Sequence, residues 1–191
     1  MRLSASSSRR LIGAVAMTCV AALAPVAALA ATASPAGHTG AAVATSTPRC
    51  TTSGLVIWLD TQGSGTAGST YYNLEFTNLY RHACTLFGYP GVSGVNLVGH
   101  RLGSAASHNA AHAPSVVTLP GGATATVVLR ITDVFAFPSS ACGRQTAAGL
   151  RVYPPNQTAS KVVPFPFVAC SHTGPVYLSV EAVQKGIATA G

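Results

Sequence analysis

The chain has 191 residues, which is enough for one domain of ordinary size with appendages and too few for two full domains. Only 8% of the residues are charged and 48% are hydrophobic, so the composition excludes a disordered polyelectrolyte and predicts a packed core. The four carboxylates are too few for multi-carboxylate calcium sites or for two-metal sites. Several large classes of enzyme are therefore excluded.

Residues 1–30 have the three parts of a secretory signal peptide. Arginines at 2, 9 and 10 form a basic start, an apolar run follows over 11–24, and Ala28-Leu29-Ala30 fits a cleavage site. Paired arginines occur in both twin-arginine and ordinary signals, so the route of export stays open. An uncleaved membrane anchor is the alternative, but Pro25 interrupts the apolar run and favours cleavage. We predict a secreted protein without a membrane span after cleavage.

The charge that remains after cleavage is modest. Eight basic and four acidic residues leave a net charge of +4 when the histidines are neutral. The basic residues are scattered singly, and no run is dense enough to follow a phosphate backbone. This distribution argues against a nucleic-acid partner. Two explanations of the positive charge stay open: it keeps the protein soluble, or it gives a weak attraction to anionic wall polymers and lipid headgroups.

A linker and one domain follow the signal. Residues 31–48 are mostly Ala, Thr, Ser, Gly and Pro, which cannot bury enough surface to fold, so we predict a disordered linker. Residues 49–191 form the predicted domain. Apolar and polar residues alternate with a period of two, which is typical of strands. The candidate strands lie at 55–60, 73–77, 92–98, 116–119, 123–132, 150–153, 162–168 and 176–182.

These strand patterns predict an all-β fold. About eight strands are separated by Gly and Pro turn signals, and no helical stripe of ten residues lies outside the signal. Strands with one apolar face favour antiparallel sheets packed against each other. We therefore expect an antiparallel, immunoglobulin-like β-sandwich with two disulfides, and a β-barrel is the alternative.

The cysteines predict two disulfides. Cys19 lies in the predicted signal, which leaves four cysteines, and an even number in an exported chain is typical of disulfide bonds. Three pairings are possible, and the sequence alone does not choose among them. We prefer Cys50 with Cys84 and Cys142 with Cys170, because each bond then joins neighbouring segments. Zinc binding is disfavoured, since no two cysteines have the C-x-x-C spacing.

Motifs associated with enzymes are present only in part. Residues 63–68 spell G-x-G-x-x-G, but a dinucleotide site needs a helix next and a strand pattern follows, so we predict a hairpin loop. A serine hydrolase needs a positioned histidine and commonly a G-x-S-x-G elbow, to which Gly91-Val92-Ser93-Gly94 is the nearest match. Four carboxylates in or beside strands offer no clear pair for glycoside hydrolysis. We predict no catalytic residues.

Three histidines are candidate metal ligands. His100, His108 and His112 lie within thirteen positions, in a stretch rich in Ala, Ser and Gly between two strand patterns. Imidazole is the commonest transition-metal ligand, so the three rings are candidates to converge on copper or zinc. A solvated loop explains them equally well, since no orienting carboxylate lies nearby. We therefore assign no metal and no other cofactor, and keep the histidines as candidates.

A structural turn is predicted at Gly88-Tyr89-Pro90-Gly91. Pro90 fixes its own φ angle, the two glycines permit turn geometry, and Tyr89 can bury its ring. Asn78, a little earlier in the chain, is expected to hydrogen-bond the backbone near the turn before Cys84. We interpret both features as structural.

The cysteines and several short motifs together resemble a known family. The motifs are Cys50, Gly68-Ser69 ahead of 72–78, Cys84-Thr85-Leu86, Gly88-Tyr89-Pro90-Gly91-Val92, Leu119-Pro120-Gly121-Gly122-Ala123, Cys142, and Cys170 before the last strand pattern. On these residues, the chain resembles exported actinobacterial proteins grouped as domain of unknown function 4232. The resemblance implies a secreted or lipid-anchored β-sandwich of the cell envelope with two disulfides. It implies no activity, because the family has no established catalytic residue, and Cys19 lacks a lipoprotein context.

The function predicted from the sequence is that of a non-catalytic binding or structural module. We expect it to be secreted or associated with the cell wall, with a wall polymer or an envelope protein as its partner. A metal-binding protein that uses the histidine stretch is the first alternative. An extracellular hydrolase is the second.

Overall fold

The computed structural model of the chain describes residues 46–186. The predicted signal peptide and nearly all of the predicted linker lie outside these residues. Within residues 46–186, no helix is long and apolar enough to cross a membrane. The longest helical segment described is α1 (Ser139–Cys142), and 3-10 turns occur at Thr52–Gly54 and Val134–Ala136. The described part of the chain is therefore built mainly from strands.

The larger sheet has six strands. Its order is β1 (Leu55–Thr66), β2 (Ser69–Asn78), β8 (Thr124–Thr132), β11 (Leu178–Val180) and β6 (Ser107–His108), and β12 (Gln184–Lys185) also pairs with β8. All pairs are antiparallel except β11 with β6, which is parallel. This sheet is therefore mixed.

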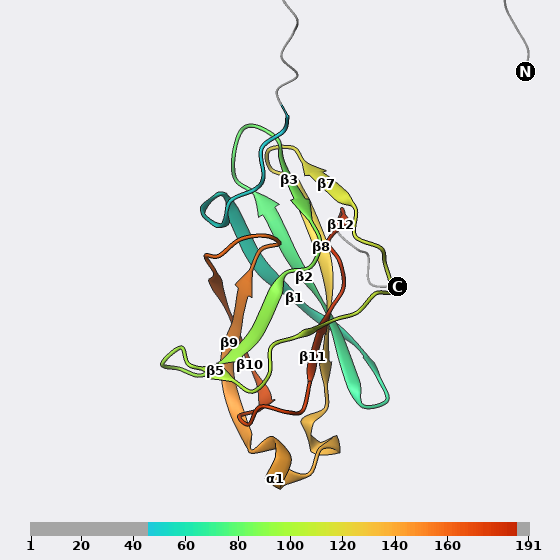
Figure 1. Cartoon of the computed structure of the whole chain (residues 1–191), viewed down its shortest axis with the longest axis vertical. Helices are drawn as coiled ribbons and strands as arrows, with labels where there is room; N and C mark the ends of the chain where they lie inside the picture. Colours follow the sequence, from blue (N-terminus) through green and yellow to red (C-terminus); the bar gives the residue numbers. More distant parts are fainter. Residues whose placement is uncertain (1–45, 187–191) are drawn as a thin grey trace, which may run out of the picture. The chain divides into compact units, whose positions relative to one another are not determined.

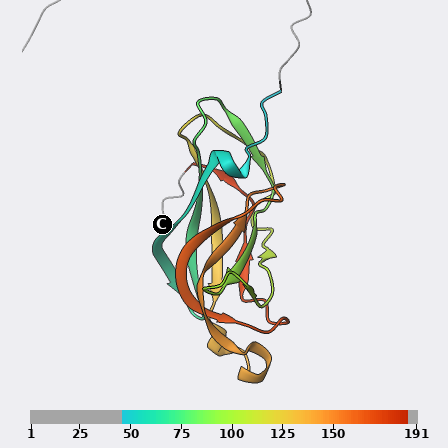
Figure 2. The same ribbon diagram turned by 90° about the vertical axis from the view of Figure 1, so that its left-hand side faces the viewer.

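A second sheet of four strands packs against the first (Figures 1 and 2). Its order is β10 (Lys161–Cys170), β9 (Arg144–Tyr153), β4 (Gly91–Val95) and β5 (Arg101–Leu102), and every pair in it is antiparallel. A separate antiparallel pair, β3 (Cys84–Phe87) with β7 (Val116–Leu119), lies beside the predicted turn.

The core lies between the two sheets because each long strand turns its alternate apolar residues inward. In β8, Val127 and Leu129 are fully buried, and in β9 Leu150 and Val152 are fully buried. They belong to one continuous cluster of buried residues drawn from both sheets. The strand patterns read from the sequence therefore point to the observed core.

Tyr177 is the largest fully buried side chain and connects the sheets. It precedes β11 in the larger sheet, and its hydroxyl donates a hydrogen bond of 3.0 Å to the carbonyl oxygen of Leu102 in β5. Burial raises the pKa of this phenol to about 12. A Cβ atom on Gly94 would lie 2.7 Å from the hydroxyl, so glycine in β4 leaves the space that Tyr177 fills.

Two disulfides are present in the structure: Cys50 bonds to Cys84, and Cys142 bonds to Cys170. They are the pairs that the sequence analysis preferred. The first joins the segment before β1 to β3, and the second joins α1 to the end of β10. All four cysteines are at most 1% exposed, so both bonds belong to the core.

The predicted fold needs correction in its details. The structure is β-rich, as expected, but the described residues form twelve strands in three sheets, with one parallel pair, where about eight antiparallel strands were expected. The strand order does not establish an immunoglobulin-like topology. The additional strands are short: β5, β6 and β12 have two residues each, which is too few for alternation to be detected in the sequence.

Candidate functional site

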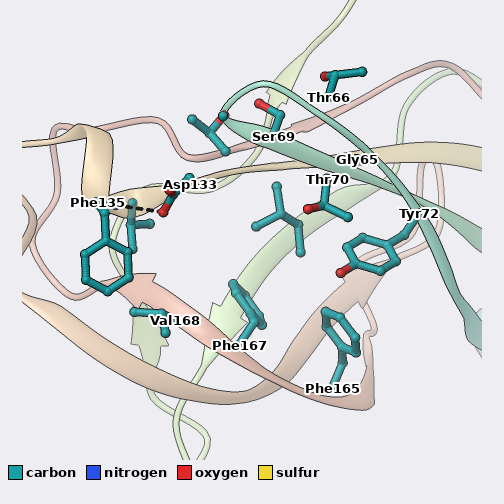
Figure 3. Close-up of a pocket in the computed structure, with 14 residues that line it drawn as sticks. Gly65, Thr66, Ser69, Thr70, Tyr72, Asp133, Phe135, Phe165, Phe167 and Val168 are labelled. Atoms are coloured by element: carbon teal, nitrogen blue, oxygen red, sulfur yellow. Dashed lines mark hydrogen bonds between the residues drawn. The ribbon is translucent and has the colours of Figure 1, made fainter.

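A cleft of about 410 Å³ opens where the turn between β1 and β2 meets the ends of β8 and β10 (Figure 3). The β1–β2 hairpin supplies Gly65, Thr66 and Gly68, which belong to the predicted hairpin loop over 63–68. The hairpin is confirmed, although β1 continues as far as Thr66. The backbone N–H of Asp133 donates a hydrogen bond of 2.9 Å to the carbonyl oxygen of Gly68, so the hairpin turn is tied to the end of β8.

Aromatic rings form the floor of the cleft. The rings of Tyr72 and Phe165 meet edge to face with their centroids 5.0 Å apart, and Phe165 lies 5.8 Å from Phe167. Figure 3 shows these three side chains side by side, on β2 and β10. All three are only partly buried and pack against the core on one side. Their remaining surfaces are open to a bound molecule.

Polar groups border the aromatic floor. Asp133 is exposed, and its Oδ1 accepts a hydrogen bond of 3.0 Å from the backbone N–H of Phe135. The Oγ1 atom of Thr132 is buried and has no hydrogen-bond partner. Ser69 and Thr70 add two further hydroxyl groups. The cleft therefore combines aromatic surface with hydroxyls and one carboxylate.

Phe135 forms the far wall of the cleft, and Arg144 holds its ring in place. Its guanidinium carbon lies 4.8 Å from the centre of the Phe135 ring, and its Nη2 donates a hydrogen bond of 2.9 Å to the carbonyl oxygen of Phe137. The Cys142–Cys170 disulfide closes the same segment. Phe135 is 65% exposed, so few packing contacts restrict its ring. The cation–π contact with Arg144 supplies such a restriction.

The three candidate histidines are not brought together. Within residues 46–186, no three His, Cys, Asp or Glu side chains form a group that could hold a metal ion. His108 stacks on Tyr89 with the ring centres 4.2 Å apart, and Nδ1 of His112 lies 2.9 Å from Oε2 of Glu181. His100 is exposed beside the β4–β5 turn. The arrangement does not support a metal site on this stretch.

The predicted turn at Gly88-Tyr89-Pro90-Gly91 lies between β3 and β4. Gly88 has φ +98°, which favours glycine, and its carbonyl oxygen accepts a hydrogen bond of 2.9 Å from the N–H of Val183. The stacking of Tyr89 on His108 holds the histidine stretch against the turn. These contacts give the motif a structural role.

Asn78 stabilises the connection between β2 and β3 through hydrogen bonds of its side chain. Its Nδ2 donates hydrogen bonds to the carbonyl oxygens of His82 at 3.0 Å and Leu119 at 2.9 Å, and its Oδ1 accepts one from the N–H of Tyr80 at 2.9 Å. The side chain is fully buried. It bonds the backbone before Cys84, as the sequence analysis expected.

Glu75 is a fully buried carboxyl group that the sequence analysis did not single out. Oε2 lies 2.7 Å from Oγ1 of Thr126, whereas Oε1 is buried without a hydrogen-bond partner. Burial raises the pKa of Glu75, and the nearby negative charge of Asp60 adds to the effect. The Thr126 hydroxyl also bonds the carbonyl oxygen of Gly186, so its one hydrogen cannot serve both acceptors. The buried carboxyl group is therefore short of hydrogen-bond donors.

We expect Glu75→Gln to stabilise the protein at neutral pH. A carboxyl group whose folded pKa is raised stabilises the fold below its unfolded pKa, and this contribution is lost as the pH rises through the folded value. The wild-type protein should therefore lose stability as the pH rises from about 4.5, the ordinary pKa of the group, and the variant should lose less. Urea denaturation at pH 4 and pH 7 measures the difference.

The matched control for this prediction is Glu181→Gln. Glu181 is also buried, but Oε1 accepts a hydrogen bond of 3.2 Å from Asn109 and Oε2 contacts His112. Both oxygens have partners, so this substitution should destabilise the fold at pH 7. Equal effects of the two variants would show that the missing partner of Glu75 has no energetic consequence.

Sequence reasoning missed the cleft because its residues come from separated segments. One signal was present: 164–168 reads Pro-Phe-Pro-Phe-Val, which places two aromatic residues two positions apart in a strand. The β9–β10 register shifts between Pro164 and Phe167, as expected for a bulge. Prolines are tolerated there because β10 is an edge strand.

Comparisons with known proteins place the chain in a family without assigning a role. No curated protein and no solved structure matched it. Residues 50–184 match the family described as "Domain of unknown function (DUF4232)". The match spans both disulfides, the aromatic cleft and the β4–β5 hairpin. On this evidence, the chain belongs to the DUF4232 family.

Proposed function

We propose that the protein is an exported, non-catalytic binding module of the cell envelope or its surroundings, and that the aromatic cleft is its ligand site. The ligand we infer is a saccharide unit of an envelope polymer. The aromatic floor and its polar border are the single observation that carries this proposal.

The two disulfides support an extracellular location. Two buried disulfides persist outside the reducing cytoplasm, whereas they are rare in proteins that stay inside it. The predicted signal peptide at 1–30 gives the same location from independent residues. In that location, wall polymers and envelope proteins are the molecules available for it to bind.

The chemistry of the cleft suits a sugar ring. The C–H face of a sugar packs on aromatic side chains, while its hydroxyl groups need donors and acceptors at the border. Tyr72, Phe165 and Phe167 supply the aromatic surface. The hydrogen-bonding groups at the border are the Asp133 carboxylate and the hydroxyls of Ser69 and Thr70. An extended polymer also fits an open cleft that is reached from solvent.

A binding role suits the cleft better than glycoside hydrolysis. Retaining and inverting glycosidases both use two carboxyl groups across the scissile bond. Among the described residues that line the cleft, Asp133 is the acidic one, and His, Lys and Cys are not represented. Glu75 and Glu181 are buried among other contacts. These observations favour binding without turnover.

Titration calorimetry of the purified protein tests the proposal with a panel of soluble tetrasaccharides of glucose and N-acetylglucosamine. We expect at least one to bind, and Phe165→Ala to weaken its binding about tenfold or more, because one aromatic contact is worth about 1.5 kcal/mol. Asp133→Asn should also weaken binding, although its side-chain oxygen still accepts the hydrogen bond from Phe135.

Trp58→Ala is the matched control, since Trp58 is an exposed aromatic residue of β1 outside the cleft. It should leave saccharide binding unchanged. Circular dichroism and intact mass verify the fold and the disulfides of every variant. Failure of all the saccharides to bind, or equal loss in the control, contradicts the proposal. Release of new reducing ends would instead support the hydrolase alternative.

A further inference from the structure

The turn between β4 and β5 is an ordered protrusion of the four-stranded sheet (Figure 1). Asn96 organises it: its Oδ1 accepts hydrogen bonds from the N–H groups of Val98 at 3.2 Å and His100 at 2.8 Å. Its backbone N–H and carbonyl group also bond across the turn, to His100 and Gly99. Gly99 has φ +81°, which suits glycine. The tip therefore has a defined shape.

Two aliphatic side chains project from this tip. Leu97 is 94% exposed and Val98 is 74% exposed, the two highest values among the exposed large hydrophobic residues described. A single exposed aliphatic residue is ordinary, but two adjacent ones on a fixed turn present apolar surface that water solvates poorly. Burying this surface in an apolar phase would be favourable.

A small basic pocket of about 260 Å³ lies on the outer face of the same sheet. Strand register explains it: Ser93 in β4 is directly opposite Arg151 in β9, and Arg101 in β5 is opposite Val95. Alternation places these side chains on the face away from the core. Ser93 is only 6% exposed, lines the pocket, and makes no hydrogen bond from its hydroxyl to any described residue. Two guanidinium groups and a free hydroxyl suit a phosphate group.

Arg151 connects the pocket to the tip. Its Nη2 donates a hydrogen bond of 2.6 Å to the carbonyl oxygen of Gly99, so the guanidinium is held between the turn and the pocket. None of the four acidic residues of the chain lines this pocket. Positive charge and apolar surface therefore lie next to each other on one rigid element.

We propose that the β4–β5 hairpin docks the protein on an anionic lipid bilayer. A lipid phosphate enters the pocket formed by Ser93, Arg101 and Arg151, while Leu97 and Val98 enter the boundary between headgroups and acyl chains. Charge complementarity argues for this occupant, since residues 46–186 carry eight basic and four acidic side chains. An anionic bilayer matches both halves of the surface, because it offers phosphates and an apolar layer within a few ångströms of each other.

Vesicle flotation tests the proposal with the purified protein. Vesicles of phosphatidylcholine with 30 mol% phosphatidylglycerol should bind it, and vesicles of phosphatidylcholine alone should bind it about tenfold more weakly or not at all. Leu97→Ser/Val98→Ser and Arg101→Gln should each weaken binding to the anionic vesicles, the first by about tenfold or more because two aliphatic groups are removed. Raising sodium chloride from 0.1 to 0.5 M should weaken binding of the wild type more than of Arg101→Gln.

A fluorescence measurement reports insertion directly. Trp58 is the one tryptophan of the chain, so Leu97→Trp combined with Trp58→Phe places a single reporter at the tip. Its emission should shift to shorter wavelengths with anionic vesicles and stay unchanged with phosphatidylcholine vesicles.

Leu79→Ser and Arg81→Gln are the matched controls, since both residues are exposed in the connection between β2 and β3, away from the hairpin. They should bind vesicles like the wild type. Equal binding by the tip variant and the wild type would overturn the proposal, as would absence of vesicle binding. Binding of glycerol phosphate at Ser93 and Arg101, seen by NMR without vesicle binding, would show a site for soluble phosphate and would also overturn it.

Discussion

Cys142→Ala/Cys170→Ala should destabilise the fold by about 3.5 kcal/mol. The bond joins cysteines 28 positions apart, and the chain-entropy model gives about this value for a loop of that length. Both cysteines are fully buried, and alanine avoids introducing an unpaired hydroxyl. The loss is a large share of the stability of an ordinary domain. Urea denaturation of the oxidised wild type and the double variant, with linear extrapolation, measures the difference.

This disulfide also supports the far wall of the cleft, which gives the prediction a second readout. Cys142 ends α1, a few residues after Phe135, and Cys170 ends β10, which carries Phe165. The double variant should therefore bind the saccharide more weakly even where it is folded. Cys50→Ala/Cys84→Ala is the control: it removes a bond of similar span, 34 positions, outside the cleft. It should cost about as much stability and leave binding of the folded protein unchanged.

Tyr177→Ala should cost about 3–5 kcal/mol, as for other large aromatic residues that are removed from a core. The ring is fully buried between the two sheets, and its loss leaves a cavity beside Gly94 and Phe167. Tyr177→Phe keeps the ring and leaves the carbonyl oxygen of Leu102 without this donor, so it should cost about 1–2 kcal/mol. Urea denaturation of the three proteins measures both steps.

Alkaline pH gives an independent measurement of the same residue. The folded pKa of Tyr177 is raised to about 12, so its contribution to stability is complete below pH 10 and is lost as the pH rises toward 12. Tyr177→Phe should lack this part of the alkaline destabilisation.

Tyr71→Ala is the control for the packing prediction, because Tyr71 is only half-buried in β2. The stability cost of Tyr71→Ala should be well below that of Tyr177→Ala. Similar costs would show that Tyr177 is not central to packing.

The long strands could be predicted from the sequence because burial on one face repeats with a period of two. In β8 the pattern extends over nine residues, and Val127, Leu129 and Ile131 are buried as the alternation indicates. Two-residue strands such as β5 and β6 contain no such repeat and form only where longer strands offer an edge. Their pairing, including the parallel β6–β11 contact, is decided by tertiary structure.

The histidine stretch shows why proximity in sequence does not make a site. His108 and His112 are four positions apart, but each is held by a partner from a distant segment: Tyr89 for the first and Glu181 for the second. The orienting carboxylate that the sequence seemed to lack is Glu181, at 69 positions from His112. The cleft has the same property, since Tyr72, Asp133 and Phe165 are close together only after folding.

The prolines of β10 bear on self-association. Pro164 and Pro166 have no backbone N–H to donate, and they lie in the outermost strand of the four-stranded sheet. An incoming strand from a second molecule would find donors missing along this border, so intermolecular sheet extension is blocked there. The border of the other large sheet, β1, is interrupted by a register shift between Asp60 and Ser64. These two irregular borders therefore disfavour fibre-like aggregation by strand addition at β10 and β1.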